Sequence, residues 1–127
     1  MTPTEQLLFQ IKEARLPAPA TNPQGSTEYR FAAEVVGTHK GVRKRLKERG
    51  LQDWRFDMAW PEYMVALEIE GGGWVGGRHT RGKGFYGDMR KYHAAVCLRW
   101  QVYRCDVEMV RSGMAIEALR VLLGGAK

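Results

Sequence analysis

The run from Tyr63 to Glu70 constrains the fold more than any other stretch, because it is nearly all apolar and yet carries two carboxylates at its end. An apolar run of this length predicts a central strand covered on both faces. Glu68 and Glu70 stand two residues apart, so strand geometry places them on the same face. Their burial is costly unless a cation, a proton or a basic partner offsets the charge. The alternative is an edge strand whose acids face solvent.

A second strand-like run precedes this one. From Asp53 to Trp60, apolar residues alternate with polar ones, which predicts a strand with one apolar face and with Asp57 on the other. Pro61-Glu62 predicts a turn that reverses the chain, because proline has no amide hydrogen for a strand ladder. Asp57, Glu68 and Glu70 are therefore the candidate site.

Composition bounds the class of protein. With 127 residues the chain is expected to form one domain, residues 1–127. Twenty Lys and Arg against 14 Asp and Glu give a net charge of +6, which predicts a polyanionic partner. No apolar run is long enough to span a bilayer, and the N-terminal stretch is not a secretory signal, so we expect no membrane partner and a cytoplasmic location. Cys97 and Cys105 are expected to be reduced core thiols.

The positive charge is concentrated in two segments. One is a basic insertion at about 38–50, between two predicted strands, and the other is a glycine-rich loop that also holds His79. We expect the basic side chains of both segments to contact DNA phosphates: Lys40, Arg43, Lys44, Arg45, Lys47, Arg78, Arg81 and Lys83. The alternative is an ordinary solvated helix face.

The remaining elements follow from periodicity. A mixed α/β sheet of about four strands flanked by helices, in the order αβββαβα, accounts for the whole pattern. The predicted elements besides those above are a helix at 4–15 capped by Thr4, a loop at 16–26 that does not pack, a strand at 27–36, a short helix at 38–50, a helix at 85–98, a strand at 99–105, and a final helix that begins at Asp106 or Ser112.

The helix at 85–98 carries several side chains of interest. Phe85, Met89, Tyr92 and Val96 predict its apolar stripe, and Asp88 and Lys91 are expected to form an ion pair on its surface. The last pair in this helix, His93 and Cys97, is spaced for a metal but is expected to pack in the core.

A family resemblance rests on these residues. Asp57, followed after ten residues by Glu68-Ile69-Glu70, resembles the signature of the PD-(D/E)xK nucleases, in which a lysine usually stands where this chain has Glu70. With His79, Asp88, Lys91 and the strand at 99–104, the chain is similar to the branch of very-short-patch repair endonucleases and small phage or prophage endonuclease-like proteins. The resemblance implies a restriction-endonuclease-like sheet and metal-dependent hydrolysis of DNA.

The resemblance also implies roles for individual residues. Asp57 and Glu68 would bind Mg²⁺, with Mn²⁺ as a substitute, because hard cations take carboxylate oxygens and activate water for phosphodiester cleavage. Glu70 would hold a water on that metal, bind a second metal or act as the base. Further roles are implied for Glu5 as an extra helical acid, with Glu13 and Glu28 as competitors, for His79 in orienting water or contacting phosphate, and for Lys91 in supplying the positive charge that Glu70 does not.

Three functions remain open from the sequence. The first is a metal-dependent endonuclease acting on branched or recombination-intermediate DNA, for which a symmetric substrate such as a four-way junction would call for a homodimer. The second is a non-catalytic nucleic-acid-binding module that has lost the chemistry with the lysine. The third is a protein-interaction domain whose basic surface meets an acidic partner.

Overall fold

The chain is organised around a three-stranded sheet with strand order β3-β4-β5. A computed structural model describes residues 1–31, 54–70 and 83–124, and within the last range it describes side chains from residue 89 onward. β3 (Met58–Trp60) pairs antiparallel with β4 (Val65–Ile69), and β4 pairs parallel with β5 (Gln101–Cys105). The predicted mixed α/β class is therefore confirmed.

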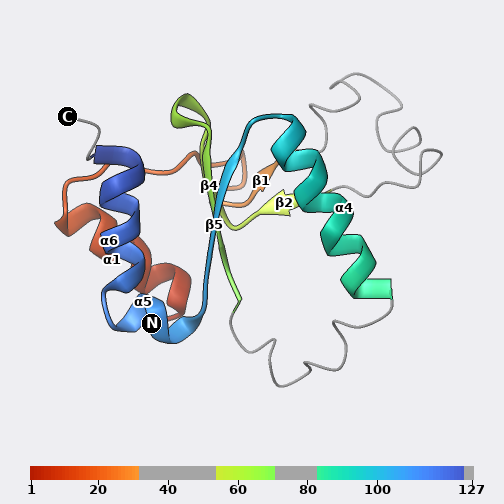
Figure 1. The fold of residues 1–127 in the computed structure, drawn as a ribbon. Coiled ribbons are helices and arrows are strands. Elements are labelled where there is room, and N and C mark those ends of the chain that lie inside the picture. The colour runs from red at the N-terminus through yellow and green to blue at the C-terminus, as the bar shows by residue number, and fades with distance from the viewer. Residues whose placement is uncertain (32–53, 71–82, 125–127) are drawn as a thin grey trace.

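Helices lie on both faces of this sheet (Figure 1). One face carries α1 (Pro3–Glu13), α5 (Val107–Arg111) and α6 (Met114–Leu119), which continues into the π-turn η3 (Arg120–Gly124). The other face carries α4 (Lys83–Cys97), the crossover between the parallel strands β4 and β5. None of the helices in the described ranges is long and apolar enough to cross a membrane.

The strand period divides the core into two clusters. Val65 and Leu67 of β4 pack in the cluster under α1, α5 and α6, while Ala66 packs in the cluster that includes Ala95 of α4. Aromatic rings fill the second cluster, with Phe31 stacked on Phe56 at 4.2 Å between ring centroids. Glu68 follows on the same face of β4 as Ala66, so strand geometry directs its carboxylate toward α4.

The predicted single strand from Asp53 to Trp60 is wrong. It is two strands, β2 (Arg55–Phe56) and β3, separated at Asp57, and β2 pairs with β1 (Tyr29–Arg30) in a separate two-stranded sheet. Phe56 lies in the α4-side cluster but Met58 lies in the opposite one, although strict alternation would place both on one face. Asp57 is thus an extra residue that reverses the apolar face, as a β-bulge does.

The turn after β3 is confirmed. A 3₁₀ turn, η1 (Pro61–Tyr63), is followed by Met64 in the left-handed region with φ 54°, and β4 then begins at Val65 rather than Tyr63. The loop at 16–26 does pack, contrary to expectation. Trp60 Nε1 donates to the carbonyl of Pro17 at 2.8 Å, and a second bond of 2.8 Å joins residues 20 and 59. The loop at 16–26 therefore bonds to the edge of β3 that does not pair with β4.

The helix boundaries show how caps are chosen. Thr2, not Thr4, caps α1, because its hydroxyl accepts from the Glu5 amide and the Glu5 carboxylate accepts from the Thr2 amide. Both predicted starts of the final helix are close to real starts of two helices. Asp106 caps α5, and Gly113 with φ 89° precedes α6. Within the described residues, the predicted strand at 27–36 is confirmed at Tyr29–Arg30. Its end and the predicted helix at 38–50 lie outside the described residues.

Truncation of the central strand should show how much the core depends on it. Leu67 of β4 is fully buried, so Leu67→Ala is expected to lower the free energy of unfolding by about 2–5 kcal/mol through lost burial and a residual cavity. Chemical denaturation measures the change. Val121→Ala is the control, because Val121 is 69% exposed and its truncation should change stability by less than about 0.5 kcal/mol. Equal effects of the two variants would contradict the described core.

Candidate active site

Asp57 is fixed at the break between β2 and β3. Its Oδ2 accepts a hydrogen bond of 2.7 Å from the Ile69 amide at the end of β4. Its main-chain carbonyl accepts a bond of 2.8 Å from the Thr27 hydroxyl. The Asp57 side chain thus takes the place of a backbone carbonyl as the acceptor for the Ile69 amide. This bond holds the carboxylate beside Ile69, the residue between Glu68 and Glu70.

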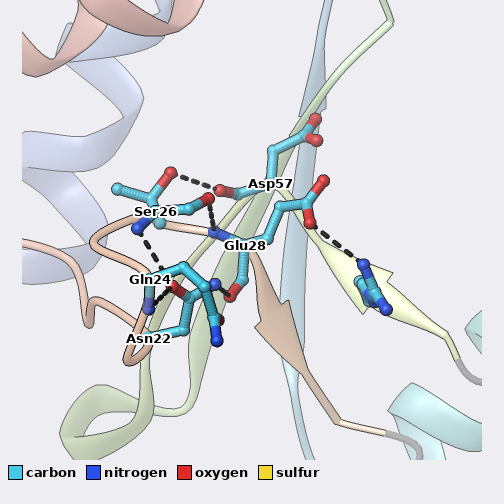
Figure 2. A network of polar contacts seen from close by, with 7 residues as sticks. Asn22, Gln24, Ser26, Glu28 and Asp57 are labelled. Atoms are coloured by element: carbon cyan, nitrogen blue, oxygen red, sulfur yellow. Dashed lines mark hydrogen bonds and ion pairs between the residues drawn. The ribbon is translucent and has the colours of Figure 1, made fainter.

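A polar loop supports Asp57 from the side of β1 (Figure 2). Asn22 Oδ1 accepts from the amides of Gln24 and Ser26 at 3.0 Å each, and Ser26 Oγ accepts from the amide of Glu28 at 3.1 Å. Such side-chain to backbone bonds build an Asx-type turn from a segment rich in proline and glycine. The loop therefore fixes the chain on both sides of Thr27, the residue that binds the carbonyl of Asp57.

The same loop lines a pocket of about 670 Å³ together with the outer side of the β1–β2 pair. Asn22, Glu28 and Arg55 are among its walls, and Arg55 pairs with Glu28 at 3.2 Å. None of the three candidate acids lines this pocket. The chemistry of the acids therefore has to be judged from their own contacts.

Among the side chains that the structure describes, Glu68 is the buried charged one, with 8% of its surface exposed. Its carboxylate accepts from Lys91 Nζ and from the Tyr92 hydroxyl, both on α4. The Lys91 side chain is itself only 15% exposed. The cation neutralises the charge of the buried carboxylate, and both donors form hydrogen bonds to its oxygens. The crossover helix α4 therefore supplies the basic partner that a buried acid in an apolar strand requires.

Glu70 has a partner on β5. Arg104 Nε donates to its Oε2 at 2.8 Å, and the two side chains are 47% and 43% exposed. This bond, the largest of the influences on it, raises the pKa of the Arg104 guanidinium above its ordinary value. The guanidinium also lies 4.6 Å from the centre of the Tyr92 ring. Glu68 and Arg104 are register partners in the parallel pair, so Arg104 lies beside both acids.

Tyr92 joins the two ion pairs. Burial, and then its hydrogen bond to Glu68, raise the pKa of its phenol well above the ordinary range. The group therefore stays protonated and donates at every physiological pH. Lys91 Nζ lies 5.5 Å from the same ring and 5.9 Å from that of Phe56. Both cations thus lie close to the Tyr92 ring.

The contacts of α4 bear on three expectations. Lys91 pairs with Glu68 of β4, and the side chain of Asp88, its expected partner, lies outside the described residues. Met89 and Val96 of that stripe are 48% and 69% exposed, while Ala95 is fully buried. His93 and Cys97 are also exposed, so the expectation that they pack in the core is wrong, whereas Cys105 is buried as expected. Burial raises the pKa of the Cys105 thiol to about 11.

The other predicted site residues are not brought to the acids by any described contact. Glu5 is exposed, and its carboxylate is engaged by Thr2 in the cap of its own helix. Most of the predicted DNA-contacting side chains and His79 lie outside the described residues: Lys40, Arg43, Lys44, Arg45, Lys47, Arg78 and Arg81. Lys83 begins α4, but its side chain also lies outside the described part. Their roles stay predictions.

The sequence does not predict the contacts of Tyr92 and Arg104 with the acids. It predicts Tyr92 in an apolar stripe and Arg104 in a strand without a functional role. A signal for the first was available, because a buried glutamate in β4 demands donors and the next element in the chain is the crossover helix that covers that strand. The pairing of Arg104 with Glu70 depends on the parallel register of β4 and β5, which the sequence does not specify.

The charge balance bears on metal binding. Asp57, Glu68 and Glu70 face two cations, Lys91 and Arg104, so these five side chains leave one negative charge. Within the described part of the chain, Asp57 has a backbone amide but no cation as partner. In the same ranges, no group of three or more His, Cys, Asp or Glu side chains is arranged to hold a metal ion.

Removal of Lys91 should expose the cost of burying Glu68. Lys91→Met keeps most of the side-chain packing but leaves the carboxylate with Tyr92 alone, so the free energy of unfolding should fall by about 3 kcal/mol. Chemical denaturation at neutral pH measures the loss. The double variant Lys91→Met, Glu68→Gln should recover a large part of it, because the buried charge is then gone. A loss below about 0.5 kcal/mol in the single variant would contradict the described pair.

The raised pKa of Tyr92 predicts an alkaline loss of stability. Below about pH 10, the ordinary tyrosine pKa, its contribution is fully present. Above that pH the unfolded chain releases the proton while the folded protein retains it, so stability falls. Tyr92→Phe should be less stable at neutral pH but decline less steeply above about pH 10. Urea denaturation across this range tests it, and Tyr103 and Cys105, whose pKa values are also raised by burial, should retain the remaining slope. An unchanged slope would contradict the described environment of Tyr92.

Comparisons of the chain with protein-family models, with curated proteins and with solved structures found no match. The function therefore has to be inferred from the chemistry of the site.

Proposed function

We propose that the chain is a metal-dependent DNA endonuclease that hydrolyses phosphodiester bonds, with branched or recombination-intermediate DNA as its substrate. One observation carries the proposal: Lys91 meets the buried Glu68 at the end of β4, next to the residue whose amide fixes Asp57. This is the combination of two acids and a lysine that the PD-(D/E)xK resemblance requires, with the lysine supplied by α4 and not by position 70.

The order of the described elements supports the finer fold assignment. A helix is followed by strands that lead to β4, then by a crossover helix to a parallel strand, and then by terminal helices. The αβββαβα arrangement implied by the resemblance has a similar succession, although the described ranges hold four short strands before α4 and two helices after β5. Its acids would stand at the carboxyl end of β4, where Glu68 and Glu70 lie.

Asp57 and Glu68 are the proposed ligands of Mg²⁺, which is commonly held by one or two carboxylates and several waters. When bound, the cation would lower the pKa of a coordinated water and offset charge on the phosphate. Asp57 is oriented for this role by the Ile69 amide, and Glu68 by Lys91 and Tyr92. Glu70 is held by Arg104 and would accept a hydrogen bond from a water at the same edge of the sheet.

Lys91 has two tasks in this proposal. It fixes one oxygen of Glu68, and it places a positive charge beside the acids where a phosphodiester would lie. Tyr92 stays protonated and donates to the other oxygen. The net charge of +6 would draw the DNA polyanion toward a site that is itself slightly negative, and the basic segments at 38–50 and 78–83 are the proposed phosphate contacts.

A specific observation favours a second candidate, a nucleic-acid-binding module without catalysis. Protein cations already neutralise two of the acids, since Lys91 pairs with Glu68 and Arg104 pairs with Glu70. A metal would have to compete with both. In this candidate the ion pairs serve the fold alone, and the basic surface alone carries the function.

Cleavage assays distinguish the two candidates. Supercoiled plasmid, linear, flapped and four-way-junction DNA are incubated with the full chain in Mg²⁺, Mn²⁺ or EDTA. The wild type should nick or cut in either metal and not in EDTA. Asp57→Asn and Glu68→Gln should each reduce the rate by about 100-fold or more, because each removes a negative ligand without a change of size.

Controls separate chemistry from folding and binding. Glu62→Gln removes an exposed acid on η1 and should leave the rate unchanged. DNA affinity in EDTA should be kept in the Asp57 and Glu68 variants, and should weaken as salt rises. Full activity in both variants would overturn the proposed site. Salt-dependent binding with no cleavage of any substrate would favour the binding module instead.

A further inference from the structure

The outer face of α4 carries a pair of metal-binding side chains that the acidic site does not use. His93 and Cys97 are both exposed and lie four residues apart on the helix, with Cys97 Sγ 3.6 Å from His93 Nε2. Helix geometry stacks residues at this spacing on one face. The inner face of the same helix presents Lys91, Tyr92 and Ala95 to the sheet. The pair is therefore separated from Glu68 by the body of the helix.

The distance between the two donor atoms suits a tetrahedral zinc ion. Zinc binds thiolate at about 2.3 Å and imidazole nitrogen at about 2.0 Å, and a tetrahedral angle then places the two donor atoms about 3.5 Å apart. The 3.6 Å between Sγ and Nε2, a thiol–imidazole hydrogen-bond contact in the metal-free chain, is close to this separation. Sulfur and imidazole donors select zinc and similar cations over Mg²⁺, which prefers oxygen.

Two ligands fill only half of a zinc coordination shell. Structural zinc sites take four protein ligands. Across the described ranges, no third His, Cys, Asp or Glu joins His93 and Cys97 in a group that could hold a metal. A two-fold axis through the ion would bring the same two side chains from a second copy and complete a Cys₂His₂ set, because a two-fold interface repeats each contact.

The surroundings of the pair suit a second copy of the chain. Met89 and Val96 flank it at helical spacing and are 48% and 69% exposed. The four positions 89, 93, 96 and 97 form a continuous stripe that faces away from the sheet. Apolar side chains on both sides of an interfacial ion would exclude water from it, which strengthens the attraction between the zinc ion and the thiolates. In the dimer these exposed apolar side chains would be buried against the same residues of the second copy.

We propose that His93 and Cys97 bind zinc together with the same residues of a second copy, so that the outer face of α4 is a zinc-dependent dimer interface. On binding, each Cys97 thiol releases its proton to solvent and the thiolate sulfur bonds to zinc, while the Nε2 lone pair of each His93 bonds to the same ion and Nδ1 keeps its proton. No oxidation is involved. The proposal stands or falls independently of the nuclease function.

The test titrates the full chain, kept reduced by a phosphine, with Zn²⁺ and separately with Co²⁺. We expect one metal per two chains, a doubling of the mass in light scattering, and a Co²⁺–thiolate charge-transfer absorption. EDTA should reverse all three, which separates metal bridging from an intermolecular disulfide. Cys97→Ser and His93→Gln should each abolish dimer formation, and the Co²⁺–thiolate band should be absent from Cys97→Ser although Cys105 remains.

A matched pair of variants tests the interface apart from the ligands. Val96→Glu places a charge in the stripe and should prevent dimer formation. Val121→Glu should not, because this valine has the same 69% exposure but lies in η3, which continues α6 on the opposite face of the sheet from α4. Both sites are exposed, so folding should be kept. One metal per monomer without a change of mass, dimer formation in Cys97→Ser, or no thiolate band in the wild type would each overturn the proposal.

Discussion

The burial of the Glu68 carboxylate is the constraint on which the arrangement of α4 depends. A charged group with 8% exposure in a central strand is stable only with a cation and a hydrogen-bond donor in contact. Lys91 and Tyr92 supply both, and they are consecutive, so the helix has to turn the edge that holds them toward β4. The rest of its orientation follows. Ala95 enters the core one turn later, while Met89 and Val96 are left on the outside.

Asp57 performs the corresponding task for the other half of the sheet. Where β2 ends and β3 begins, its side chain accepts a hydrogen bond from the Ile69 amide. In a regular strand a backbone carbonyl would accept this bond. The bulge directs Phe56 into one core and Met58 into the other. One polar residue thus connects the β1–β2 pair to the three-stranded sheet, and the same interaction holds a carboxylate at the end of β4. Structure and proposed chemistry use the same atoms.

The sequence predicts much of the fold because local signals decide it. Periodicity and the proline turn locate β4, α4 and β5, and capping residues place the starts of the last helices to within a residue or so. The break at Asp57 could not be predicted, since Trp54, Phe56, Met58 and Trp60 alternate without interruption and only tertiary contacts reverse the face. The predicted apolar stripe of α4 is wrong for the same reason. A hydrophobic pattern predicts that Met89 is buried and Lys91 exposed, but the need of the buried Glu68 charge for a cation outweighs that preference.

The orientation of α4 also decides which side chains lie at each of the two proposed metal sites. Its inner face brings the Lys91 ammonium and the Tyr92 phenol to the Glu68 carboxylate, so a cation at the proposed Mg²⁺ site would have to compete with both donors. Its outer face holds a thiol and an imidazole nitrogen at 3.6 Å, the donor types that the proposed zinc site would use. Because both faces are set by the single demand of Glu68, a substitution that rotates the helix would disturb both sites at once. Ligand softness, and not distance alone, would keep Mg²⁺ and zinc apart.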